Sequence, residues 1–246
     1  MRKFIIPVLF GGLILTTAAC DVLNEVANAV VTDPGSTTPA LTNGEVISGL
    51  KEALTIGIQN SVSLTSVTDG FLKNESIRLP FPPDALKVRE KAIEWGLSGQ
   101  VEKFETTLNR AAEEATKEAL PIFKEAILNM SISDGFTILN GGDGAATKFL
   151  RDNTTTKLVA AFSPKVEAAI SKVKLTEYWN PIITKYNQAM ALTGGQKVNP
   201  DLNAYVTERA VLGLFQMVEL EENKIRKDPA ARVTELLSKV FGSIKK

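Results

Sequence analysis

Residues 100–115 read QVEKFETTLNRAAEEA, and the fold class of the chain follows from them. Their apolar side chains recur every three or four residues, which is the spacing of one face of an α-helix. The apolar positions are Val101, Phe104, Leu108, Ala111, Ala112 and Ala115. Polar residues fill the opposite face, so we expect an amphipathic helix that buries one stripe in a core.

The same helical spacing extends from this segment in both directions. Upstream, Val46, Leu50, Leu54 and Ile58 recur every four residues behind a capping residue, Asn43. No segment alternates apolar and polar residues for long enough to indicate a strand. We therefore predict an all-α fold: a single irregular domain of eight or nine helices over residues 44–246. Further helices are expected over residues 84–95, 100–129 with a bend at Pro121, 133–139, 144 onward, 163–173 after the capping pair Ser163-Pro164, 176–192, 199–227 and 228–241.

Residues 64–83 interrupt the helical pattern. Asp69-Gly70 marks a turn, and Leu79-Pro80-Phe81-Pro82-Pro83 cannot be helical because its three prolines lack amide donors and restrict their neighbours. We expect this run to cross the helices as an extended apolar strap. The alternative is a proline-rich ligand for a partner protein.

The N-terminus has the features of an export signal. Arg2 and Lys3 precede an apolar run over residues 4–15, which is too short to span a bilayer of about 30 Å. Thr17-Ala18-Ala19-Cys20 resembles the lipobox of bacterial lipoproteins, although Thr17 stands where leucine is usual. We predict a signal peptide over residues 1–19 and lipidation, with palmitate among the acyl chains, at Cys20. The alternative is an ordinary secretory signal.

Residues 20–43 are expected to form the lipidated cysteine and a tether. The run DPGSTTP, residues 33–39, consists of turn-forming residues without an apolar period. A disordered tether of this length has a mean reach of about 26 Å and a maximum of about 80 Å. The domain is thus expected in the cell envelope, anchored to a membrane and facing the periplasm. Asp21 leaves the choice between inner and outer membrane open.

Composition narrows the function classes. The chain carries 28 basic and 28 acidic residues, so it lacks the positive surplus that binds nucleic acid. It contains no histidine, which excludes Ser-His-Asp and Cys-His catalysis, and its single cysteine is Cys20. No cofactor motif or metal-ligand pattern occurs. We predict no cofactor and no catalytic or metal-binding residues.

Several runs resemble a family of exported bacterial proteins defined as a domain of unknown function, number four-one-nine-seven. The likeness extends over about residues 44–242 and implies an α-helical envelope domain behind a lipoprotein or secretory signal. The family has no activity to carry over, so the resemblance assigns no site residues. The matching runs lie at residues 49–54, 69–71, 77–80, 105 with 109–112, 138–147, 205–206 with 213–215, and 226–232.

One candidate polar site lies on the helix of residues 100–115. Glu105, Asn109 and Glu113 are spaced four apart on one face, with Arg110 beside them. Two carboxylates can hydrolyse a glycan, but on one helix Glu105 and Glu113 would lie about 12 Å apart, beyond the roughly 5–10 Å that this chemistry needs. We favour a polar face paired with Arg or Lys from a neighbouring helix. Glu222 and Arg226 form a further i, i+4 pair.

A second candidate site is the glycine-rich turn over residues 140–146. Its layout resembles a phosphate cradle, but Asp143 stands where the anion would bind. We expect Asp143 to cap the next helix by accepting the amide of Ala145 or Ala146. Asp134, Asn140 and Asp143 also place three oxygen donors within ten residues, which is fewer than calcium needs.

An apolar pocket is the last candidate. Tyr178, Trp179, Met190, Phe215 and Met217 could line one, or they could be ordinary core residues. Our leading hypothesis is a membrane-tethered, non-enzymatic domain that binds a partner protein or an apolar ligand. The alternative is a carboxylate-based glycan hydrolase of the envelope. Two facing carboxylates in a groove would favour the enzyme, a dry cavity would favour the lipid binder, and neither would favour a scaffold.

Overall fold

The computed structural model describes residues 41–172, 175–198 and 201–243, and no strand occurs among them. The expected signal, Cys20 and most of the tether lie outside the described residues. Residues Gly44–Lys246 form one compact unit. The all-α prediction is confirmed. The helices are α2 (Asn43–Thr65), α3 (Leu86–Glu94), α4 (Ser98–Thr116), α5 (Ala119–Leu128), α6 (Ile132–Asn140), α7 (Ala145–Lys172), α8 (Leu175–Thr193), α9 (Leu202–Lys227) and α10 (Glu235–Ser243), with short 3-10 turns η1 (Pro83–Ala85) and η2 (Pro229–Ala231).

Helices α4, α7 and α9 pack against one another and form the centre of the domain. The predicted apolar stripe of α4 is buried along its whole length, and Leu108, Ala111, Ala112 and Ala115 are fully inaccessible. Alanine at three of these positions lets the neighbouring helices approach closely. Phe123 and Phe215 complete the middle of the core, with their rings edge to face at 5.7 Å.

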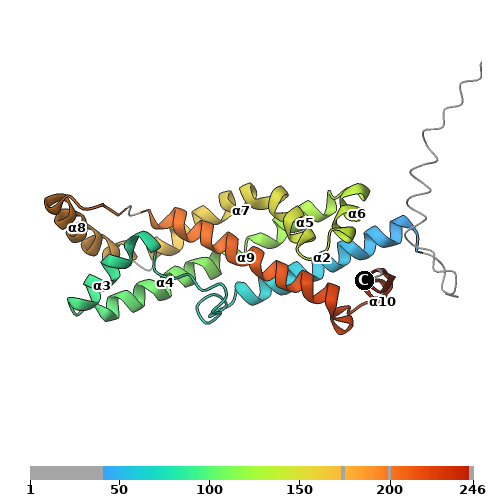
Figure 1. Cartoon of the computed structure of the whole chain (residues 1–246), viewed down its shortest axis with the longest axis horizontal. Helices are drawn as coiled ribbons and strands as arrows, with labels where there is room; N and C mark the ends of the chain where they lie inside the picture. The colour runs from blue at the N-terminus through green and yellow to red at the C-terminus, as the bar shows by residue number, and fades with distance from the viewer. Residues whose placement is uncertain (1–40, 173–174, 199–200, 244–246) are drawn as a thin grey trace, which may run out of the picture. The chain divides into compact units, whose positions relative to one another are not determined.

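The remaining helices cover the two ends of this centre (Figure 1). At one end, α3 and α8 pack on α4 and on each other. At the other end, α2 meets α10 and α6, because a Cβ at Gly49 would lie 2.8 Å from Val240 and one at Gly135 would meet Ile47. The start of α2, where the chain enters the domain, therefore lies at the end that α3 and α8 do not occupy. We call this the entry end. Among the described residues, no helix has both the length and the apolar character to cross a bilayer.

The structure corrects three of the predicted helix boundaries. The last helix was expected over residues 228–241, but residues 229–231 form only the 3-10 turn η2 and α10 begins at Glu235. The helix expected over residues 100–129 divides at Lys117 and Glu118 into α4 and α5. A helix start was expected at Ser163-Pro164, but α7 runs through Pro164 without a break. The proline removes one amide hydrogen bond. Burial on both sides of it offsets that loss, since Leu158, Phe162, Val166 and Ile170 continue the apolar stripe every four residues.

Residues 66–82 link α2 to η1, and we call this whole segment the strap. Residues 66–77 form a series of turns, and only residues 78–82, within or next to the run expected to be extended, lack regular structure. The strap lies against both α4 and α9. Phe71 and Ile77 contact α9 at Gly213, where a Cβ would lie 2.8 Å from the Phe71 ring. Phe81 packs against Phe104 of α4, with ring centroids 4.8 Å apart. The strap therefore buries its own apolar side chains in the core. This burial supports a structural role over a role as a ligand for a partner protein.

Candidate functional site

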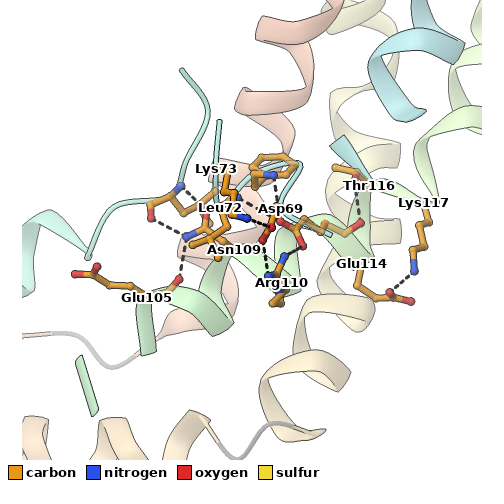
Figure 2. A network of polar contacts seen from close by, with 12 residues as sticks. Asp69, Leu72, Lys73, Glu105, Asn109, Arg110, Glu114, Thr116 and Lys117 are labelled. Atoms are coloured by element: carbon orange, nitrogen blue, oxygen red, sulfur yellow. Dashed lines mark hydrogen bonds and ion pairs between the residues drawn. The ribbon is translucent and has the colours of Figure 1, made fainter. Parts of the chain in front are cut away.

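The polar face of α4 binds the backbone of the strap (Figure 2). The Glu113 carboxylate accepts hydrogen bonds from two consecutive amides, Phe71 at 3.1 Å and Leu72 at 3.2 Å. One turn earlier, the Asn109 side chain accepts from the Leu79 amide at 2.8 Å and donates to the Leu79 carbonyl at 3.1 Å. Asn109 thus pairs with the strap as a neighbouring β-strand would.

This arrangement explains why α4 carries these residue types. A buried segment without helix or sheet leaves amide and carbonyl groups unpaired, and each unpaired group costs free energy. Asparagine offers a donor and an acceptor, and a carboxylate accepts two amides at once. Asn109 is fully buried and Glu113 is 4% exposed. These two side chains supply the hydrogen bonds that the strap cannot make with itself.

Arginines brace the same face. Arg110 binds Glu113 at 2.8 Å and Asp69 at 2.6 Å, and so joins α4 to the turn that begins the strap. Hydrogen bonds hold the pKa of Asp69 below its usual value; the bond from Lys73 has the larger effect and the bond from Arg110 the smaller. Hydrogen bonds to the carboxylates of Glu113 and Asp69 raise the pKa of Arg110, and Glu113 has the larger effect. We call Glu113, Asn109, Arg110 and Asp69 the strap clamp.

Glu105 continues the row toward α3. Its carboxylate binds Arg89 at 2.7 Å and Arg78 at 3.4 Å. The structure therefore brings Glu105, Asn109 and Arg110 together along one face, with cationic partners from the strap and from α3. On the α9 side, the Tyr205 hydroxyl donates to the Pro80 carbonyl at 2.9 Å, and burial raises the pKa of that phenol.

A second carboxylate holds the glycine-rich turn. Glu222 of α9 accepts the amides of Ala146 at 3.0 Å and Thr147 at 2.8 Å, at the start of α7. Arg226 binds Glu222 at 2.9 Å and donates to the carbonyl of Ile138 at 2.8 Å, at the end of α6. This α9 clamp, Glu222 and Arg226, fixes both helix ends that flank the turn.

The α9 clamp corrects the expectation for Asp143. Glu222, rather than Asp143, accepts the amide of Ala146, and the amide of Ala145 donates to the Gly142 carbonyl. Asp143 instead pairs with Lys227 at the surface. The first-turn amides that a phosphate would use are thus bound by a carboxylate of the chain itself.

The other oxygen donors near this turn have separate partners. Asp134 forms a capping box with Ser131 at the start of α6, which lowers the pKa of Asp134 through the Ser131 hydroxyl and amide. Asn140 is the exposed last residue of α6. Within the part of the chain that the structure describes, no three acidic, histidine or cysteine side chains gather as a metal-binding group.

Three of the five residues considered for an apolar pocket are buried in the core. Trp179 belongs to the core, since its ring stacks on Phe104 at 4.7 Å, and Phe215 and Met217 are also buried. The Tyr178 side chain lies outside the described residues.

An apolar pocket between α2, α9 and α10 measures about 20 Å³, which holds about one water molecule. A polar pocket of about 160 Å³ between α5, α6 and α7 includes Asp134, and Glu125 and Lys157 in its lining pair at 2.7 Å.

From their spacing alone, Glu222 and Arg226 were predicted to form only an ordinary i, i+4 pair. The position of Glu222 in the helical repeat of α9 already indicates that it is buried. Residues 211, 214, 215, 218 and 225 of α9 are buried, and Glu222 falls on the same face. A charged residue in the apolar stripe of a helix indicates a buried partner, because an unpaired buried charge is costly.

The chain matches the family described as proteins of unknown function (DUF4197) over residues 40–242, and it belongs to that family. No curated protein matches the chain, and no solved structure matches it.

Proposed function

We propose that this protein is a lipid-anchored, non-enzymatic scaffold of the bacterial cell envelope, whose helical domain binds a partner protein. The proposal combines the N-terminal sequence, with Cys20 as the acylation site, and the use that the domain makes of its polar residues. The observation that carries it is the strap clamp. In it the buried carboxylate of Glu113 is bound to the backbone of the same chain, as the carboxylate of Glu222 is in the α9 clamp.

A general acid or base must exchange a proton with a substrate, and so its carboxylate has to be accessible. Glu113 and Glu222 are buried and each accepts two backbone amides and an arginine. Glu105 is bound by Arg78 and Arg89. These bonds give the carboxylates a structural role, which favours the scaffold over the glycan hydrolase.

The apolar ligand is disfavoured relative to a protein partner by volume. A pocket for a small molecule commonly measures several hundred Å³. The apolar pocket against α2 holds about 20 Å³, and Phe241 and Ile225 are among the residues that line it. A lipid chain would have to open the core in order to enter it.

A protein partner is favoured by the end of the domain that α3 and α8 form. Trp95 is 51% exposed just after α3, and Leu86 at the start of α3 is 48% exposed. Tryptophan is enriched among the residues that dominate binding energy at protein interfaces. This end lies opposite the entry end (Figure 1), so a partner bound there would leave the start of α2 uncovered.

The anchor is tested by metabolic labelling. Cells producing the wild type should incorporate labelled palmitate into this protein, and cells producing Cys20→Ser should not. The variant should also accumulate as uncleaved precursor, because the lipoprotein peptidase cuts only after acylation. Absence of label in the wild type would contradict the anchor.

The partner is tested by photo-crosslinking in cells. A photo-reactive residue at Trp95 should give one discrete adduct with a protein. The matched control is Val159, an apolar residue of α7 that is 41% exposed. Equal adducts from both sites, or none from Trp95, would contradict the assignment. A lipid retained by the purified domain in native mass spectrometry would favour the apolar-ligand alternative.

A further inference from the structure

Three strongly exposed aliphatic side chains, Leu128, Ile132 and Val233, lie at the entry end. Among the described residues, the four most exposed large apolar side chains are Leu192 at 89%, Leu128 at 74%, Val233 at 68% and Ile132 at 60%. Leu192 lies near the end of α8. The other three lie at the end of α5, at the start of α6 and just before α10, and these segments pack beside α2.

Direct contacts place these segments. The Lys51 ammonium of α2 donates to the Leu128 carbonyl at 3.0 Å, so the end of α5 is fixed beside α2. Gly135, three residues after Ile132, packs against Ile47. On the α10 side, Leu236 lies 3.0 Å from a Cβ built at Gly49, and it follows Val233 by three residues.

The residues around Val233 are also held in place. Arg232 donates to the carbonyls of Ile225 at 3.1 Å and Arg226 at 2.9 Å. The backbone on which Val233 stands is therefore tied to the end of α9. An aliphatic side chain held on a fixed backbone and left in water gains free energy when an apolar phase covers it.

We propose that the entry end is a membrane-contacting surface, on which Leu128, Ile132 and Val233 enter the interface of the bilayer that holds the anchor. This inference rests on the proposed lipid anchor at Cys20. Figure 1 shows the start of α2, the α5–α6 connection and α10 at this same end of the domain.

Chain length argues for the membrane as the occupant. Twenty-three residues separate Cys20 from Gly44, where the domain begins. A connection of that length keeps the entry end at a high effective concentration near the lipid surface. Three aliphatic side chains would bind a membrane weakly from solution, but a tethered surface needs only a weak contact.

Charge argues for apolar rather than electrostatic contact. The chain has equal numbers of basic and acidic residues. Lys51 at the entry end uses its ammonium to bind the Leu128 carbonyl. We therefore expect the contact to persist in vesicles without anionic lipid and at about 1 M salt, where the Debye length falls to about 3 Å.

The test uses the acylated full-length protein in vesicles of phosphatidylethanolamine and phosphatidylcholine. Cys20 is the only cysteine, and acylation consumes its thiol, so Leu128→Cys introduces a single labelling site for an environment-sensitive fluorophore. The matched control is Leu192→Cys, at a still more exposed leucine of the opposite end. We expect blue-shifted emission at position 128, quenched several-fold by a quencher attached to the lipid chains, and water-like emission at position 192.

Each other outcome contradicts the proposal. Equal water-like emission at both positions means that the entry end stays in water. Blue-shifted emission at position 128 without quenching by the lipid means that a second copy of the chain covers the surface. Both results leave the anchor intact, whereas failure of palmitate labelling would remove the anchor itself.

Discussion

The strap clamp and the α9 clamp use the same chemistry at two places in the domain. In each, a buried glutamate accepts two consecutive backbone amides and pairs with an arginine on its own helix. They differ in the arginine, because the side chain of Arg110 is 35% exposed and that of Arg226 is 11% exposed. They also differ in what is held, which is an irregular strap in one case and the first turn of α7 in the other.

This difference bears on the free energy at stake. Water can solvate Arg110 if its glutamate is lost, but Arg226 would remain largely buried with an uncompensated charge. The positive end of the α7 dipole adds a further favourable term for Glu222. Two glutamates with the same kinds of contact therefore need not contribute equally to stability. The exposure of the paired arginine decides which contributes more.

The largest effect is expected for Glu222→Ala. This variant leaves a buried arginine and two amides unpaired, and it should lower the free energy of unfolding by about 3–5 kcal/mol. Denaturant unfolding followed by circular dichroism measures the change. Glu222→Gln keeps an acceptor oxygen and should lose less. A cost for Glu222→Ala below that of Glu113→Ala would show that exposure of the arginine is not the deciding factor.

Glu113→Ala should cost about 1–3 kcal/mol, the penalty for leaving buried donors unsatisfied. The loss should be local. Hydrogen exchange at the Phe71 and Leu72 amides should speed up, while exchange at Ala146 and Thr147 follows only the global change in stability. Equal acceleration at both pairs of amides would indicate that the strap and the start of α7 open together.

Gly142→Ala tests the turn that the α9 clamp flanks. Gly142 has φ of 76°, and a Cβ there would meet no atom within 4 Å. The cost is therefore purely conformational, about 1–2 kcal/mol. Gly99→Ala is the matched control, since Gly99 is helical and also has open space. It should stabilise by roughly 0.5–1 kcal/mol, so thermal melts should shift in opposite directions.

Asp143→Ala should change stability by less than about 0.5 kcal/mol, because its ion pair with Lys227 is exposed on both sides. A helix cap at this position would cost roughly 0.5–2 kcal/mol. Calorimetry of the variant beside Lys227→Ala checks the assignment. Two small and equal losses are expected, and a large loss for Asp143→Ala alone would restore the capping role.

The smallest effect concerns pH. Lys73 and Arg110 hold the pKa of Asp69 below its ordinary value of 3.8 in the folded state. The resulting stabilisation is present above pH 3.8 and is lost as the pH falls through the lower, folded pKa. Asp69→Asn should therefore lose less stability than the wild type below pH 4. Parallel curves for the two proteins in acid unfolding would contradict this contribution.

The sequence was sufficient to predict the all-α fold and most helices, because apolar spacing along each helix reports burial without knowledge of the neighbours. The α4 stripe and the interruption of the helices at residues 64–83 follow from such local rules. The helix start predicted at Ser163-Pro164 was wrong. The local preference of proline for a helix start is outweighed by the packing of Phe162 and Val166. Secondary structure here follows tertiary burial when the two compete.

The candidate sites were predictable only in part. Arg89 of the neighbouring helix α3 pairs with Glu105, as the polar-face interpretation expected, whereas the second partner, Arg78, comes from the non-helical strap. The partners of Glu113 and Glu222 are backbone amides more than 40 and 70 positions away. No spacing rule in one chain reports such contacts, because they depend on how separate helices meet.

The meeting of α2 with α9 and α10 also has a consequence for biosynthesis. Asn60 of α2 bonds to Glu221, 161 positions later, and Gly49 packs on α10. A growing chain consequently releases α2 long before its apolar partners exist, with Leu50 and Ile58 exposed to solvent. Contacts so distant in sequence slow folding and prolong the aggregation-prone stage. Chains truncated before residue 221 should therefore depend on holdase chaperones and be degraded quickly.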